Sequence, residues 1–116
     1  MLQGKWTLVS GELEGVEISR EDLPKYRLEI TDNRHRVTWA NSVLEGTHTI
    51  DESQSPMTID STDSSGLFKG MRIEGILELD GDEFSICFAA PGESRPTDFT
   101  TLNRKAVVLH RWKRQA

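Results

Sequence analysis

Apolar and polar residues alternate with a period of two through most of this chain, which is typical of strands buried on one face. The clearest alternation runs over 26–31 and 84–89, where every second residue is a large apolar one. Segments rich in Asp, Asn and Gly separate these stretches, as turns between antiparallel strands require. The pattern predicts eight strands, at 4–11, 26–31, 35–39, 43–50, 56–61, 72–80, 84–89 and 106–114.

Eight strands with mostly short connections predict one all-β domain over residues 1–116, an antiparallel up-and-down barrel. Closing the sheet removes the edge strands that would otherwise pair with other chains. A two-layer β-sandwich gives nearly the same pattern and stays the alternative. Ser19 and Asp22 predict a short helical turn after the first strand, which Pro24 ends. Residues 90–105 are expected to form an irregular loop that Phe99 attaches to the body.

The charge and composition of the chain limit the kinds of molecule and environment that we expect the protein to encounter. The net charge of −5 argues against a nucleic-acid surface, which needs basic patches to neutralise phosphates. Cys87 is the single cysteine, so no internal disulfide is expected. No stretch approaches the ~18 apolar residues of a transmembrane helix. The first residues lack the basic and then apolar pattern of a signal peptide, and the compartment stays undetermined.

Gly4 and Trp6 in the first strand, with an Arg on the last strand, resemble the lipocalin signature. In that superfamily the Trp lies at the closed end of the barrel and the Arg packs across its indole. The resemblance implies these structural roles for Gly4, Trp6 and Arg111. Arg111 is chosen because it shares a strand face with Val107 and Leu109.

The whole chain also resembles a bacterial lipocalin-like domain family of uncharacterised function. The matching segments are LQGKW at 2–6, PMTID at 56–60, GILELDGD at 75–82, Cys87, and RPTDF at 95–99. The family usually carries an aromatic residue near Leu77, and this chain does not. The resemblance implies a lipocalin or calycin fold and no established activity, so function has to be argued from the site.

His48 is the first candidate for a functional residue. In a regular strand it shares a face with Leu44, which should point inward, and an inward imidazole can bind a ligand or a haem iron. A bulge at Gly46 would turn it to solvent, and a core or rim histidine without function is the other alternative. His110 is expected to face solvent and His35 to lie beside a turn. The histidines show no spacing typical of metal ligands.

Cys87 and Arg95 each have two interpretations. Cys87 would be a nucleophile if Arg95 lowered the pKa of its thiol; otherwise it is a small, partly buried apolar residue. Arg95 would either hold a ligand carboxylate at the barrel mouth or tie the long loop to the body. The acidic residues at 60–63 and 80–83 lack the spacing of a calcium loop. No catalytic residue, metal ligand or cofactor is therefore predicted.

The leading hypothesis is a non-enzymatic module that binds a small, partly apolar ligand in the barrel. The first alternative is a filled barrel that binds protein or polysaccharide through its loops or outer surface, with Trp112 beside Arg111, Lys113 and Arg114 as the surface. The second is a haem- or thiol-dependent enzyme that uses His48 or Cys87. The residues expected around an interior ligand are Tyr26, Trp39, His48, Phe84 and Ile86, with Arg95 at the mouth.

Overall fold

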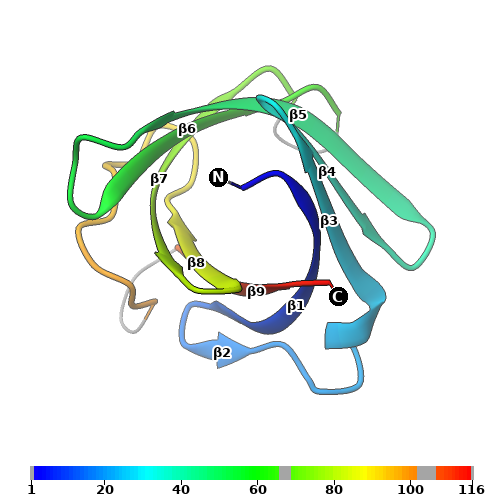
Figure 1. Ribbon diagram of the computed structural model, residues 1–116. Coiled ribbons are helices and arrows are strands. Elements are labelled where there is room, and N and C mark those ends of the chain that lie inside the picture. The colour runs from blue at the N-terminus through cyan, green and yellow to red at the C-terminus, as the bar shows by residue number, and fades with distance from the viewer. Residues whose placement is uncertain (1, 66–68, 102–106, 116) are drawn as a thin grey trace.

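The computed structural model describes residues 2–65, 69–101 and 107–115. These residues form nine strands and one short 3-10 helix (Figure 1). In chain order the elements are β1 (Gly4–Leu13), β2 (Val16–Glu17), η1 (Leu23–Lys25), β3 (Tyr26–Thr31), β4 (Arg34–Trp39), β5 (Ser42–Asp51), β6 (Met57–Asp63), β7 (Arg72–Asp80), β8 (Glu83–Phe88) and β9 (Val108–Arg114).

The strands close into an antiparallel barrel, as predicted. The sheet order is β2-β1-β3-β4-β5-β6-β7-β8-β9, and β1 also pairs with β9, which joins the two ends of the sheet. Figure 1 looks into the resulting ring, with the N-terminal segment inside its outline and β2 outside it. β2 is an additional two-residue strand paired with the end of β1. The closure excludes the sandwich, because a sandwich keeps two separate sheets.

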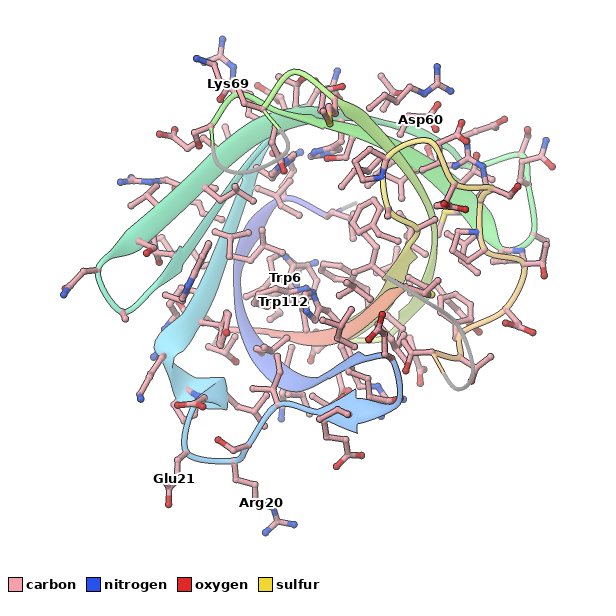
Figure 2. The ribbon with its side chains drawn as sticks, turned by 180° about the vertical axis from the view of Figure 1, so that it is seen from behind. Trp6, Arg20, Glu21, Asp60, Lys69 and Trp112 are labelled. Atoms are coloured by element: carbon pink, nitrogen blue, oxygen red, sulfur yellow. The ribbon has the colours of Figure 1, made fainter. Side chains whose placement is uncertain are left out.

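The register of the ladders assigns an inner and an outer face, because residues directly opposite each other share a face. Trp6 lies opposite Leu28 of β3, and Leu8 lies opposite Trp112 of β9. Figure 2 shows Trp6 and Trp112 inside the ring. Buried residues from the N-terminal segment and from six of the strands, all but β2, β4 and β5, form one core, composed of Leu2, Trp6, Leu8, Leu28, Ile30, Ile59, Leu77, Phe84, Ile86 and Trp112.

A second, smaller apolar cluster lies on the outer wall. Ile76 and Cys87 alternate with the inner-face residues of β7 and β8, and they are buried against Val107. Phe99 and Leu109 pack on the same cluster. Phe99 thus attaches the long connection after β8 to the barrel, as predicted. The part of that connection at 102–105 lies outside the described residues.

The prediction for the two faces of the last strand was wrong. Alternation placed Val107, Leu109 and Arg111 on the core side, because two of them are apolar. In the structure this face points outward, and its apolar residues pack under the connection that carries Phe99. Trp112, on the opposite face, is only 3% exposed and belongs to the core. The inner and outer faces of the last strand were exchanged in the prediction because its outer face is covered by this connection and is therefore also apolar.

The short helical turn predicted after the first strand is present, and the N–H groups of Asp22 and Leu23 donate to the carbonyl of Ser19. It does not end before Pro24 as expected, because η1 spans Leu23–Lys25 and contains Pro24 in its first positions. Proline fits there because the first N–H groups of a helix have no intrahelical acceptor. The preceding segment, with Arg20 and Glu21, lies at the periphery of the molecule (Figure 2).

Candidate functional site

Trp6 and Arg114 close one end of the barrel. The guanidinium carbon of Arg114 lies 4.2 Å from the centroid of the Trp6 ring, and its Nη1 donates to the carbonyl of Gln3. Nε1 of Trp6 donates to the carbonyl of Leu2 at 3.0 Å. The prediction gave the role of Arg114 to Arg111, which is exposed on the outer face. The ladder places Arg114 directly opposite Trp6.

A polar cluster occupies the inner wall formed by β4, β5 and β6. We call it the inner polar cluster, and its members are His35, His48, Ser61 and Asp63. His48 lies opposite Ser61, and Gly46 separates His35 from Asp63 in the ladder. His48 is 5% exposed and Asp63 7%. Burying a polar group this deeply lowers the stability of the fold unless the group is hydrogen-bonded.

His35 connects the two ends of this cluster. Its Nε2 lies 3.1 Å from Oδ1 of Asp63, and its Nδ1 lies 3.1 Å from Nδ1 of His48. The two imidazoles are stacked, with ring centroids 5.3 Å apart. A carboxylate and two imidazoles thus form a continuous chain of hydrogen bonds.

The bonding pattern assigns the tautomers when both rings are neutral. Nε2–H of His35 donates to the Asp63 carboxylate, so Nδ1 of His35 accepts a hydrogen bond from Nδ1–H of His48. Nε2 of His48 then carries a lone pair. Burial, and secondarily the neighbouring His35, lower the pKa of His48 below its ordinary value, which favours the neutral form of His48 at pH 7.

Gly46 provides the space for the cluster. A Cβ atom at this position would lie 2.7 Å from Nε2 of His35 and 2.4 Å from the carbonyl oxygen of Thr62. The register runs regularly through Gly46 on both sides, without a bulge. His48 therefore lies on the inner face, the outcome expected of a regular strand.

Sequence reasoning missed His35 and Asp63. His35 is two residues before Val37, so alternation already puts it on the inner face; its position beside a turn hid this. Asp63 has the same parity as Ile59, but the strand was predicted to end at residue 61, whereas β6 continues to Asp63. His35 already lies within the strand predicted at 35–39, and extending the strand predicted at 56–61 by two residues would have placed Asp63 on the inner face as well.

The barrel is less enclosed where β4 and β8 end and where β5 and β9 begin. Four inner-face residues there, Val37, Leu44, Phe88 and Val108, keep part of their surface exposed. At the opposite end the inner-face residues Trp6, Phe84 and Leu77 are almost fully buried. Ile50, Met57 and Leu79, which also lie toward that end, are only partly buried, so the tightly packed part of the interior is the region around Trp6, Leu77 and Phe84.

Of the remaining residues predicted to surround a ligand, some lie at the less enclosed end of the barrel and others lie in the packed core. Tyr26 and Trp39 are stacked, with centroids 6.0 Å apart, where β3 begins and β4 ends. Phe84 and Ile86 belong to the packed core. His110 was expected to face solvent, but it lies on the inner face opposite Ile86. Burial lowers the pKa of His110 to about 4.

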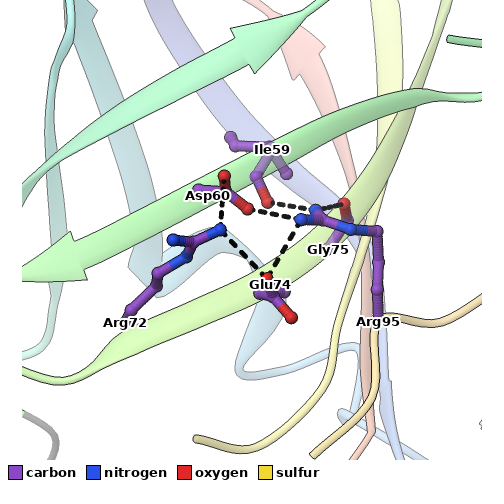
Figure 3. A network of polar contacts seen from close by, with 6 residues as sticks. All are labelled: Ile59, Asp60, Arg72, Glu74, Gly75 and Arg95. Carbon is purple, nitrogen blue, oxygen red and sulfur yellow. Dashed lines mark hydrogen bonds and ion pairs between the residues drawn. The ribbon is translucent and has the colours of Figure 1, made fainter.

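Arg95 lies on the outer wall, in a polar network shown in Figure 3. Its Nη1 donates to the carbonyls of Ile59 at 2.9 Å and Gly75 at 2.8 Å. Its Nη2 donates to Asp60 at 2.6 Å and to Glu74 at 3.2 Å. These contacts match the structural interpretation, in which Arg95 ties the long connection to the body.

Two other predicted features also lie away from the interior. Cys87 is fully buried in the outer cluster. The partner surface around Trp112 is contradicted, because Trp112 is in the core and Arg114 covers Trp6. Arg111 and Lys113 are exposed on the outer face.

Within the part of the chain that the structure describes, no three His, Cys, Asp or Glu side chains are grouped to hold a metal ion. The described residues also include no helix of the length and apolar character needed to cross a membrane. No protein-family model matches this chain, and no curated protein is significantly similar to it.

Proposed function

We propose that this protein is a lipocalin-like binding module that holds one small, partly apolar ligand inside the barrel. The observation that carries the proposal is the inner polar cluster, set in an otherwise apolar wall. Binding sites for small molecules combine an apolar lining with a few well-placed polar groups that orient the ligand. His48 and its hydrogen-bonded neighbours supply such a group.

The exposure of the inner wall supports a route for the ligand. Val37 and Leu44 keep solvent contact, and Leu44 is separated from Gly46 and the cluster by one residue on β5. Tyr26 and Trp39 add a stacked aromatic pair at the same end. A ligand entering there would pass apolar side chains before reaching His48.

The tautomer of His48 favours a ligand that donates a hydrogen bond. With Nδ1–H bonded to His35, Nε2 of His48 is an acceptor. A hydroxyl or neutral amine on the ligand would therefore suit this atom. A carboxylate would not, because it donates no proton and would be buried in the same wall as Asp63.

The proposal is tested by two-dimensional ¹⁵N–¹H NMR titration with 1-octanol and octanoate, which differ only in the polar head. Octanol should produce saturable shifts along β4 and β5, while octanoate at equal concentration should bind at least about fivefold more weakly. His48→Phe should weaken octanol binding by a similar factor, and the outward-facing Thr49→Ala should not. His48→Gln provides a second variant if the first fails to fold.

Two results would overturn the proposal. The first is the absence of any saturable shift on the inner wall with octanol, which would favour a filled barrel acting through its outer surface. Alternatively, octanol would bind the His48→Phe and His48→Gln variants as well as the wild-type protein, which would remove the role of the inner polar cluster.

A further inference from the structure

The outer face of β1, β3 and β4 is basic in a protein whose net charge is −5. Where these three strands pair, the outward positions carry four exposed cations, Lys5, Arg27, Arg34 and Arg36. Glu29 is the one outward carboxylate among them. The described residues show no ion pair that joins any of these five charged side chains to another. Nη1 of Arg27 donates to the carbonyls of Pro24 and Tyr26, so its remaining donors, together with Lys5, Arg34 and Arg36, are available to a partner.

Part of this face is hollowed into a groove of about 330 Å³. Its charged lining residues are Lys5, Arg27, Glu29 and Arg36, and Thr38 and Gln115 add uncharged polar groups. The groove lies over Trp6 and Leu28, which belong to the core, so packed residues support its floor. Arg34 is on the same strand as Arg36 but does not line the groove.

We propose that this groove binds a phosphate monoester. Three cations and one carboxylate line it, so the lining has an excess of two positive charges. A phosphate monoester carries about −1.5 to −2 at pH 7, which matches this excess better than the single charge of a carboxylate does. Arginine also presents a planar fork of donors that fits phosphate oxygens.

This site is distinct from the interior site of the proposed function. The charged residues of the groove point outward from the wall of β1, β3 and β4, whereas the inner polar cluster points inward. An experiment can therefore contradict binding at one site without contradicting binding at the other. A ligand bound in the groove would also leave the accessible end of the barrel free.

The test is an NMR titration with inorganic phosphate at pH 7.5 and constant ionic strength, with acetate as the matched monovalent anion. Phosphate should give saturable amide shifts that are confined to β1, β3 and β4. Arg36→Gln should weaken phosphate binding about five- to tenfold, whereas Arg34→Gln should change it less than twofold. Glu29→Gln should tighten binding, because it removes the one negative charge of the lining.

Three outcomes would overturn this proposal: shifts that do not saturate, acetate binding as tightly as phosphate, or an equal loss in the Arg34→Gln and Arg36→Gln proteins. The last would indicate a diffuse basic surface rather than a site. Lys5→Gln tests the same lining from another strand if Arg36→Gln does not fold, and it should weaken phosphate binding while Arg34→Gln does not.

Discussion

At the residue scale, the closed end of the barrel depends on a cation held over an indole. Arg114 contacts the face of Trp6 and donates to the carbonyl of Gln3, while Trp6 donates to the carbonyl of Leu2. These contacts join the last strand to the N-terminal segment. Arg111, three residues earlier, faces outward and makes none of them.

Replacing Arg114 by Met should lower the free energy of unfolding by about 1–2 kcal/mol, since a cation–π contact and a charge-assisted hydrogen bond are lost. The matched control is Arg111→Met, which should cost less than about 0.5 kcal/mol because the side chain is exposed. Urea denaturation measures both values. Equal losses for the two variants would contradict the assignment of Arg114.

The buried His110 makes stability depend on pH. Its pKa is about 4 in the folded protein, against an ordinary value of 6.5, because burial disfavours the charged imidazole. Above pH 6.5 the ring is neutral in both states. Between pH 6.5 and 4 the unfolded chain binds a proton that the folded protein does not, so stability decreases as the pH falls. His48, whose pKa is also lowered, acts in the same direction.

His110→Gln should reduce this pH dependence. Between pH 7 and 5 the His110 contribution amounts to at most about 2 kcal/mol of unfolding free energy, and the retained solvent contact of the ring makes it smaller. Urea unfolding at pH 7, 6 and 5 compares the wild-type and variant slopes. A variant with the wild-type slope would show that His110 is not the titrating group.

At the element scale, the outer wall shows how one connection can be held by a single side chain. Arg95 bonds to two main-chain carbonyls and to the carboxylates of Asp60 and Glu74. Arg72 contacts the same two carboxylates from β7 (Figure 3). The side chain of Arg95 is 26% exposed and that of Arg72 is 62% exposed, so water screens the Arg72 contacts more strongly.

The two arginines therefore form a matched pair for mutation. Arg95→Met should cost about 2–3 kcal/mol of unfolding free energy, because the carbonyls of Ile59 and Gly75 lose this partly buried donor and the two carboxylates lose one of their two arginine partners. Arg72→Met should cost less than about 1 kcal/mol. Thermal or urea denaturation gives the stabilities, and hydrogen exchange should accelerate at 89–101 only in the Arg95 variant. Faster exchange at 89–101 in both variants would contradict a special role for Arg95.

The elements also show why alternation predicted most strands but not all faces. In β3 one face is apolar and the other polar, so the inner residues Leu28 and Ile30 followed directly. In β9 both faces carry apolar residues, because Leu109 is covered from outside by a distant segment. Alternation cannot distinguish a core face from a covered outer face, and Arg111 was chosen over Arg114 for that reason.

At the scale of the whole molecule, pairing of β1 with β9 turns a meander into a closed barrel. The number and order of strands, and hence the barrel, were predictable from the sequence, apart from β2. The inner polar cluster was predictable only in part. His48 followed from strand parity, but its contact with Asp63 depends on register across three strands and on the space that Gly46 leaves.

The central claim is that the barrel carries a small ligand in contact with His48. Native mass spectrometry of the protein, purified under mild conditions from its own host, tests this claim most directly. We expect one reproducible additional mass per chain, which disappears on unfolding and is absent or much reduced in His48→Phe protein prepared in parallel. The bare polypeptide mass in the wild-type protein, or an adduct equally abundant in both proteins, would contradict it.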